Sequence, residues 1–345
     1  MIEHKSISEI ISLVQSKEVL VKEVIEFYLK RIKKYNSALN AIVLQKDEDK
    51  IISEANLIDT QKNNQSQPLL GLPLACKDLF DVEGLPSTYG FLGYKNNIAK
   101  KNSLIVDRLI SKGAIIIGKT NTAELGVGGH TTNRLFGPTS NPYDFSKSSG
   151  GSSGGAGAAV AAELIPFADG TDMMGSCRSP AAFANIYGFR PTTGLIPTDR
   201  SNEKKLDKFP ILTSPGCFAK SPVEMGILLD CIVGSDPLDP YSIDINGSFK
   251  DSLISDKQFS KIKIGWLKDM NGDYKFENEI IDMCELKLKE LEKHNLLIDN
   301  LQPKINSVEM WDSWTTLRAK SIFEDIKSMK IKSIDEMTFQ AIWEY

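Results

Sequence analysis

Apolar and polar residues alternate with a helical period over the first 45 residues. Ser6 and Glu9 have the spacing of a capping box. The apolar positions that follow recur every three or four residues, at Ile7, Ile10, Ile11 and Val14. A second run with the same period extends over residues 21–32. The pattern predicts two amphipathic helices in this part of the chain.

Two short apolar runs further along have the composition of β-strands. Residues 69–75 lead directly to Lys77, and the β-branched run 114–117 follows a helical pattern at residues 105–112. A helix followed at once by a buried strand is typical of a layered α/β fold. We expect the polar residues 61–67 to form a surface loop before the first of these strands.

Glycine and serine are concentrated in one segment. Residues 146–157, SKSSGGSSGGAG, contain ten of them in twelve positions, a composition that would also suit a flexible linker. A small-residue helical pattern at 156–164 and a strand-like run at 165–168 follow immediately. Because small residues between core elements let one backbone approach another closely, we expect this segment to be packed and functional.

The pattern changes after residue 194. Alternating apolar and polar residues predict a half-buried strand at 262–266, and apolar residues at 281–291 have the spacing of an amphipathic helix. From about residue 306 the chain is lysine-rich, weakly patterned and expected to be helical.

Charge is nearly balanced, with 41 basic and 45 acidic residues and a net charge of −4. Such a balance does not provide the basic surface with which proteins bind nucleic acids. No apolar run reaches the length of about 18 residues that a membrane span needs. The first ten residues carry charges where a signal peptide has its apolar stretch. We therefore expect a cytoplasmic protein that binds neither nucleic acid nor membrane.

Cysteine and histidine limit the chemistry. The five cysteines are scattered and never form a C-x-x-C pair, which predicts buried free thiols rather than a disulfide framework or a metal site. There are only three histidines, although most hydrolytic sites depend on this residue. Any mechanism is therefore expected to work without histidine.

Two motifs match known catalytic patterns but lack their context. Residues 113–120, GAIIIGKT, fit the phosphate-loop pattern, yet their apolar middle is typical of a core strand. Residues 150–154, GGSSG, match a nucleophile elbow, which needs an acid and then a histidine downstream. The only later histidine is His294, which we expect on the solvated face of the predicted amphipathic helix.

Serine chemistry without histidine needs another base, and a neutral lysine can serve. Only about one free lysine in 2,500 is neutral at pH 7, but burial lowers a lysine pKa. The apolar run before Lys77 indicates such burial. Ser176 follows a glycine in GTDMMGSCRSPA, where consecutive backbone amides could form an oxyanion hole.

This combination resembles the amidase signature family of Ser–cis-Ser–Lys hydrolases. The resembling segments are GLPLACKD (71–78), GKTNTAELGVGG (118–129), GPTSNPYD (137–144), SSGGSSGG (148–155), GTDMMGSCRSPAAFANIYGFRPTTG (170–194) and SPGCFAKSP (214–222). Lys77 lies 75 residues before Ser152, which lies 24 residues before Ser176, as in the family's triad. The resemblance covers roughly residues 1–300 and is most specific between residues 71 and 197.

The resemblance implies a catalytic role for three of these residues. Ser176 would be the acylated nucleophile. Ser152, which in the family lies on a cis peptide, would carry the nucleophile's proton and later give it to the leaving amine. Lys77 would be the ultimate base.

It also implies residues around the substrate. Backbone amides would hold the oxyanion at Met173, Met174, Gly175 and Ser176. Gly126 matches a position whose backbone faces substrate. Asp172 and Arg178 would form a supporting pair beneath the loop. Met174 stands where the family usually has glycine, which implies altered acyl specificity.

The implied fold is α/β, with a mixed, twisted β-sheet sandwiched by helices. We expect one amidase domain over residues 1–345, with an N-terminal helical segment at 1–60, a catalytic core at 61–240 and an incomplete C-terminal portion at 241–345. Family chains usually run longer, so we expect a C-terminally truncated protein. Apolar surface left uncovered by the missing part would favour self-association into a homo-oligomer.

The function that the resemblance implies is hydrolysis of a small-molecule carboxamide to an acid plus an amine or ammonia, without metal or cofactor. Two alternatives stay open. One is the A-type subunit of a glutamine-dependent tRNA amidotransferase, although residues 194–222 look more like those of stand-alone amidases. The other is a truncated amidase remnant without activity. The acyl group, the amine and any reaction with esters are not indicated.

Overall fold

The computed structural model of the chain describes residues 2–61, 67–200, 211–253, 262–302, 304–329, 331 and 334–344. The chain forms two units. One comprises Met1–Asp251 together with Ser321–Tyr345, and the other comprises Ser252–Lys320. The boundaries at residues 60 and 240 that the sequence suggests stay a prediction. The loop expected at 61–67 lies mostly outside the described residues.

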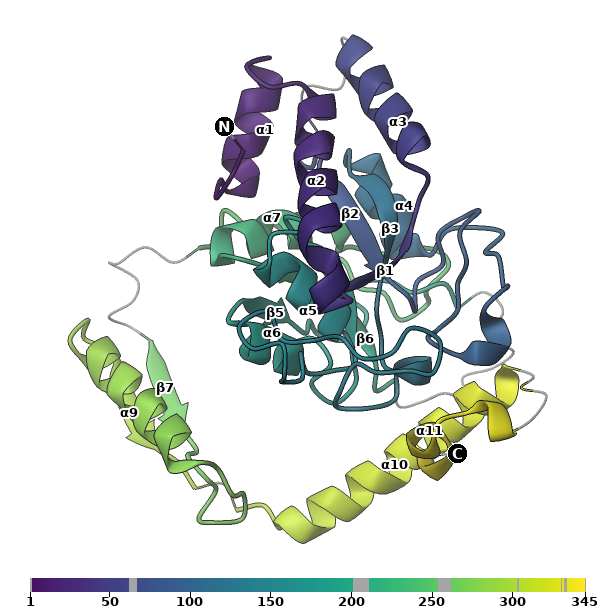
Figure 1. Ribbon diagram of the computed structural model, residues 1–345. Coiled ribbons are helices and arrows are strands. Elements are labelled where there is room, and N and C mark those ends of the chain that lie inside the picture. Colours follow the sequence, from purple (N-terminus) through teal and green to yellow (C-terminus); the bar gives the residue numbers. More distant parts are fainter. Residues whose placement is uncertain are drawn as a thin grey trace. The chain divides into compact units, whose positions relative to one another are not determined.

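The first unit begins with helices α1 (Ile7–Gln15), α2 (Val21–Leu39) and α3 (Glu48–Thr60), purple to blue in Figure 1. The Ser6 side chain accepts a hydrogen bond from the Glu9 backbone, and the Glu9 side chain accepts one from the Ser6 backbone, so the capping box is confirmed. The apolar positions of α1 and α2 are buried. The two predicted amphipathic helices are confirmed.

One three-stranded sheet has the order β1-β3-β2, formed by β1 (Ile42–Gln45), β2 (Pro73–Lys77) and β3 (Ile115–Thr120). Strands β2 and β3 are parallel and β1 is antiparallel to β3. Helix α4 (Leu104–Ser111) leads into β3. Every residue of β2 and β3 is buried. The expectation that 113–120 contains a strand rather than a phosphate loop is confirmed.

A second sheet has the order β4-β6-β5 and is antiparallel. Its strands are β4 (Ala168–Asp172), β5 (Tyr187–Phe189) and β6 (Ser214–Ala219). The sequence pattern predicts a strand at 165–168, but the strand begins at Ala168 and continues into polar residues. Pro166, which cannot donate to a ladder, lies just before it. The correction matters because it brings Asp169 and Thr171 into the strand.

Helix α5 (Gly154–Ala161), which follows the Gly/Ser segment, contacts strands of both sheets. A Cβ added at Gly155 would lie 2.4 Å from the Asn121 backbone nitrogen, so no side chain fits there. Helices α6 (Arg178–Ala184) and α7 (Pro222–Ile232) also contact the strands. The expectation that the Gly/Ser segment is packed, rather than a flexible linker, is confirmed. So is the α/β class.

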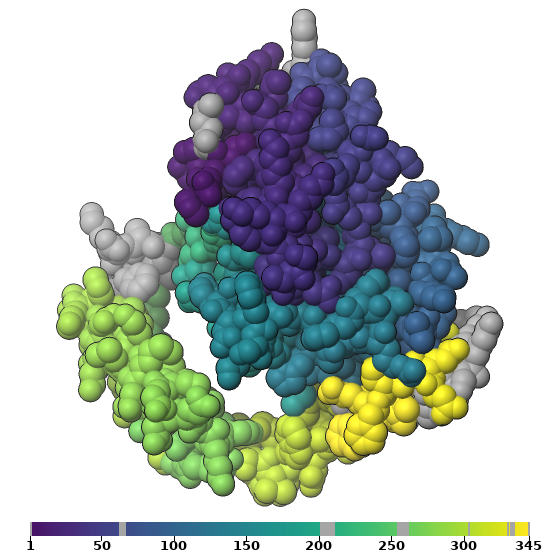
Figure 2. Space-filling view, viewed as in Figure 1, coloured from purple at the N-terminus to yellow at the C-terminus, as the bar shows by residue number. Residues whose placement is uncertain are grey.

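The remaining described elements of this unit are helix α11 (Phe339–Glu344), the end of α10 (Ser307–Ser328) and three short 3₁₀ helices. These 3₁₀ helices are η1 (Leu92–Tyr94), η2 (Glu124–Gly126) and η4 (Ile334–Glu336). In Figure 2 the yellow C-terminal segment lies against blue and teal loops of the same unit. A separate apolar cluster joins these parts and comprises Phe91, Ile322, Ile326, Met337 and Ala341.

The second unit contains parallel strands β7 (Lys263–Trp266) and β8 (Leu297–Asn300) with helix α9 (Asn278–Glu292) between them in sequence. The predicted strand and helix are confirmed. The expectation that His294 lies within the helix is wrong, because the helix ends at Glu292 and His294 lies in an exposed turn. Asn295, which follows with a left-handed φ of 61°, is a typical residue for such a helix end.

All five cysteines are free thiols. Cys284 is half-buried, and the other four are buried as expected. Among the described residues, no helix is both long enough and apolar enough to span a membrane.

Candidate active site

Lys77 is the last residue of β2 and its side chain is fully buried. Its Nζ donates a hydrogen bond of 2.8 Å to Ser152 Oγ and another of 2.8 Å to Thr171 Oγ1. Its backbone N–H donates to Asp169 Oδ1 at 2.6 Å. The lysine is therefore held from three sides, and its amine faces two hydroxyl groups.

Burial lowers the pKa of Lys77 to about 8. The carboxylates of Asp169 and Asp172 act in the opposite direction, while burial keeps the nearby Cys177 thiol protonated by raising its pKa. With this pKa about one Lys77 in ten is neutral at pH 7, compared with about one in 2,500 for a free lysine. Burial therefore raises the fraction of this amine that is neutral at physiological pH.

Ser152 lies in the Gly/Ser segment just before α5 and is 1% exposed. The Gly151–Ser152 peptide bond is cis. The Ser152 carbonyl accepts hydrogen bonds from the Ala123 N–H at 3.1 Å and from Thr131 Oγ1 at 3.2 Å. These contacts fix the backbone that presents the Ser152 hydroxyl to Lys77.

Ser176 lies between β4 and α6 and is partly exposed. The Ser153 N–H donates to its carbonyl oxygen at 3.3 Å, which joins the Ser176 loop to the Ser152 loop. Within the described part of the chain, no hydrogen bond connects the two side-chain hydroxyls. The structure thus joins Lys77 to Ser152 directly and brings Ser176 next to them through the backbone.

Asp172 organises the loop that carries Ser176. Its carboxylate accepts hydrogen bonds from the Gly175 N–H at 2.8 Å and the Cys177 N–H at 3.1 Å. Arg178 adds side-chain hydrogen bonds to both oxygens, at 2.9 and 3.0 Å. Burial raises the pKa of Asp172, but the hydrogen bonds from Arg178 and the backbone outweigh it, and the pKa lies below its usual value.

The backbone amides of residues 173–176, which are expected to bind the oxyanion, differ in their contacts within the protein, and that of Gly175 is engaged. The Gly175 N–H donates to Asp172 and is not directed at an open position. Among the described residues, the N–H groups of Met173 and Ser176 donate to no protein acceptor. The side chain of Met174 is 51% exposed.

Gly126 ends the short helix η2 and has a φ of 75°, a conformation that favours glycine. A Cβ there would lie 2.7 Å from a methyl group of Leu79. Its neighbours Leu125 and Val127 pack, together with Met173, against the apolar cluster of the C-terminal segment. The Thr338 N–H donates to Glu124 Oε1 at 2.5 Å.

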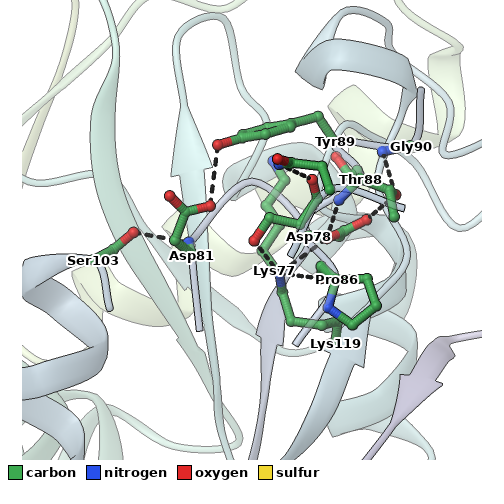
Figure 3. Close-up of polar contacts among 12 residues, drawn as sticks. Lys77, Asp78, Asp81, Pro86, Thr88, Tyr89, Gly90, Ser103 and Lys119 are labelled. Carbon is green, nitrogen blue, oxygen red and sulfur yellow. Dashed lines mark hydrogen bonds and ion pairs between the residues drawn. The ribbon is translucent and has the colours of Figure 1, made fainter. Parts of the chain in front are cut away.

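Beside Lys77, Figure 3 shows a second buried network that sequence reasoning missed. Lys119 and Asp78 are both fully buried, and Lys119 Nζ lies 2.9 Å from Asp78 Oδ1. Asp78 also accepts from the Thr88 hydroxyl and from the Thr88 N–H at 3.2 Å. Lys119 is the lysine of the GAIIIGKT motif, and here it lies fully buried within β3 with Asp78 as its ion-pair partner.

Thr171 and Asp169, the two partners of Lys77 on β4, were also missed. They are two residues apart on a strand and therefore share one face. That alternation in ADGTD is a signal that could have identified them.

A cavity of about 430 Å³ opens beside Thr171. Its walls include Leu79, Asp81, Ser103, Leu212, Pro215 and Asp325. No cluster of three or more histidine, cysteine or acidic residues that could hold a metal ion occurs in the described ranges.

The chain belongs to the amidase family, since a family model described as Amidase matches residues 23–342. It is 34% identical over 311 residues to an acylamidase of Rhodococcus erythropolis, and the aligned region covers 89% of this chain and 64% of the relative. It is 39% identical over 243 residues to the A-type subunit of glutamyl-tRNA(Gln) amidotransferase from Legionella pneumophila, covering 70% of this chain and 49% of the relative. The chain thus spans about half to two thirds of the length of these relatives.

The fold is that of the amidase signature enzymes. The crystal structure of a bacterial aryl acylamidase of this family superposes with a TM-score of 0.86 at 26% identity, over 99% of this chain and 71% of the other. The sequence-based assignment to the family and to its fold is therefore confirmed.

Proposed function

We propose that this protein hydrolyses a carboxamide to a carboxylic acid and an amine or ammonia through an acyl-Ser176 intermediate. The observation that carries the proposal is the 2.8 Å hydrogen bond between Lys77 Nζ and Ser152 Oγ at a fully buried position. A buried amine with a lowered pKa beside a serine hydroxyl is the arrangement that activates serine in the absence of histidine.

The proton path follows from these contacts. Neutral Lys77 accepts the proton of the Ser152 hydroxyl while Ser152 accepts the proton of Ser176. Ser176 Oγ then bonds to the amide carbon, and the N–H groups of Met173 and Ser176 stabilise the oxyanion. As the C–N bond breaks, Ser152 gives a proton to the leaving nitrogen and regains one from Lys77. Water then attacks the acyl carbon and gives its proton to Ser152, which passes one to Lys77. The ester bond breaks, and Ser176 Oγ regains its proton through Ser152.

Thr171 and Asp172 support this chemistry from β4. The Thr171 hydroxyl accepts the second Lys77 hydrogen bond and so directs the amine toward Ser152. Asp172, with Arg178, holds the backbone turn that presents Ser176. The identity to an acylamidase supports an acyl amide as the substrate class.

We expect a fluorophosphonate to label Ser176 in the purified protein, with about one adduct per chain by mass spectrometry, because this reagent requires an activated serine and an oxyanion site but no knowledge of the substrate. Ser176→Ala should not be labelled. Ser146→Ala, which changes the exposed first residue of the Gly/Ser segment, should be labelled like the wild type. A folded wild-type protein that is not labelled would contradict the proposal and favour an inactive remnant.

The labelling rate should rise with pH around a midpoint near 8, because the neutral form of Lys77 is the base and becomes populated above its pKa. At pH 6 the rate should be about 100-fold below its plateau. The measurement is the second-order labelling rate between pH 5.5 and 9.5, corrected for hydrolysis of the reagent. A rate that does not change over this range would exclude Lys77 as the base.

The identity to the A-type subunit of a tRNA amidotransferase supports a second candidate function, in which the same site releases ammonia from glutamine. Hydrolysis of glutamine and of simple acyl amides by the unlabelled protein, with the labelled protein as the inactive control, distinguishes the two functions. Ammonia release from glutamine, with no hydrolysis of the acyl amides, would favour the amidotransferase function.

A further inference from the structure

A buried carboxyl group lies directly beneath Lys77. Asp169 is on β4 and is 1% exposed. Its Oδ1 accepts the Lys77 backbone N–H at 2.6 Å. This bond connects β2 to β4, which belong to different sheets. At Lys77 the Asp169 carboxyl group therefore accepts the backbone N–H in place of a carbonyl from a neighbouring strand.

The charge of Asp169 is not neutralised by a bonded cation. Its Oδ2 is buried and makes no hydrogen bond of ordinary geometry among the described residues, and the side-chain donor beside the carboxyl group is the Cys76 thiol, which burial keeps neutral. In contrast, the Asp78 carboxylate is paired with Lys119, and the Asp172 carboxylate is paired with Arg178. Of these three acids around the site, Asp169 alone makes no ion pair in the described part of the chain.

The other groups that face this pair can be named for each packed element. From β4 and the start of α6, Asp172 and Cys177 act on Lys77. From β2 and β3, Cys76 and Lys119 act on Asp169. From β6, the buried thiol of Cys217, the register partner of Asp169, is also coupled to it. Helix α5, which packs against both β2 and β4, contributes only glycine, alanine and valine. The field at the Lys77 amine is therefore set by few charges, and most of these are already paired.

We propose that Asp169 is a positioning residue that fixes the backbone of Lys77 and sets the pH at which the Lys77 amine becomes a base. The inference rests on the proposed function of Lys77. An unpaired carboxylate in a medium of low dielectric stabilises the protonated form of a neighbouring amine. Asp169 thereby keeps Lys77 from losing its proton at too low a pH and stabilises the ammonium that forms during acylation.

The sign of the effect follows from the two titrations. Burial raises the pKa of Asp169 to about 6, so the carboxylate is ionised in the range where Lys77, with a pKa of about 8, loses its proton. Removal of that negative charge destabilises the ammonium. The pKa of Lys77 should then fall, and the acidic limb of the rate profile should move to lower pH.

Asp169→Asn tests this, because an amide oxygen can still accept the Lys77 N–H while the charge is absent. We expect the midpoint of the fluorophosphonate labelling profile to move down by about one pH unit. At pH 6 the rate relative to the plateau should rise about tenfold. Asp59→Asn is the matched control, since Asp59 also accepts backbone N–H groups but lies elsewhere, and its profile should equal that of the wild type.

An Asp169→Asn protein that labels with the wild-type midpoint would overturn the inference while leaving the proposed function intact. A wild-type protein that does not label would contradict the proposed function instead.

A second measurement is independent of labelling and of whether Asp169→Asn folds. Coupling between two titrating groups is reciprocal, so the carboxyl carbon that titrates near pH 6 by NMR should titrate at higher pH in Lys77→Ala. An unchanged midpoint there also overturns the inference.

Discussion

Lys77→Ala is expected to lower kcat/KM for amide hydrolysis by about 1,000-fold or more, because the residue supplies the only amine bonded to the Ser152 hydroxyl among the described residues and general-base catalysis contributes effects of this size. Fluorophosphonate labelling of Ser176 should decline in parallel. Lys77→Arg should be equally inactive, since a guanidinium keeps its proton throughout the working pH range.

Lys50→Ala is the control for this experiment, since Lys50 is exposed on helix α3, whereas Lys77 is fully buried. It should retain wild-type kinetics. The folded state of each variant is checked by circular dichroism, because Lys77 is also buried within β2. A folded Lys77→Arg protein that retains more than a tenth of the activity would show that Lys77 is not the base.

Lys119→Met is expected to give the largest loss of stability, about 3–5 kcal/mol in the free energy of unfolding. The substitution leaves the Asp78 carboxylate fully buried without the cation that lies 2.9 Å away. Asp78 would retain only the hydrogen bonds from Thr88. Urea denaturation measures the change.

Lys33→Met is the matched control, because Lys33 Nζ lies 2.7 Å from Glu48 but its side chain is 64% exposed. Its effect should stay below about 1 kcal/mol. The double variant Lys119→Met with Asp78→Leu should recover part of the loss, since it removes both charges. Equal effects of Lys119→Met and Lys33→Met would contradict the assignment of Lys119 and Asp78 as a buried pair that the fold depends on.

The spacing of apolar residues is sufficient to predict helices that bury only one of their faces. Helices α1 and α2 have regularly spaced apolar residues, and these positions are buried. Strand β4 escapes such a prediction, because its polar residues Asp169 and Asp172 are buried for reasons of tertiary contact. Helix α9 ends at Glu292, before His294, and a left-handed residue, Asn295, follows; the apolar period does not report such a helix end.

The candidate site could be predicted where residue identity alone indicates chemistry. Lys77 and Ser152 are 75 residues apart, and the family motifs suggested the pair whose side chains lie 2.8 Å apart. The alternation in ADGTD indicates that Asp169 and Thr171 share a face of a strand, but their contacts with Lys77 depend on the alignment of β4 against β2 and could not be predicted from it. The catalytic roles of Lys77, Ser152 and Ser176, and the roles of Gly126 and the oxyanion amides, stay predictions.

The apolar cluster around Phe91 has a consequence for synthesis on the ribosome. Met337 and Ala341, which pack with Phe91 and Met173, are translated about 160 residues after Ser176. At ordinary elongation rates this interval lasts roughly 8 to 30 s. During that time the nascent chain already carries Lys77 and the two serines, while Phe91 and Met173 lack their cover and are accessible to chaperones or to neighbouring chains.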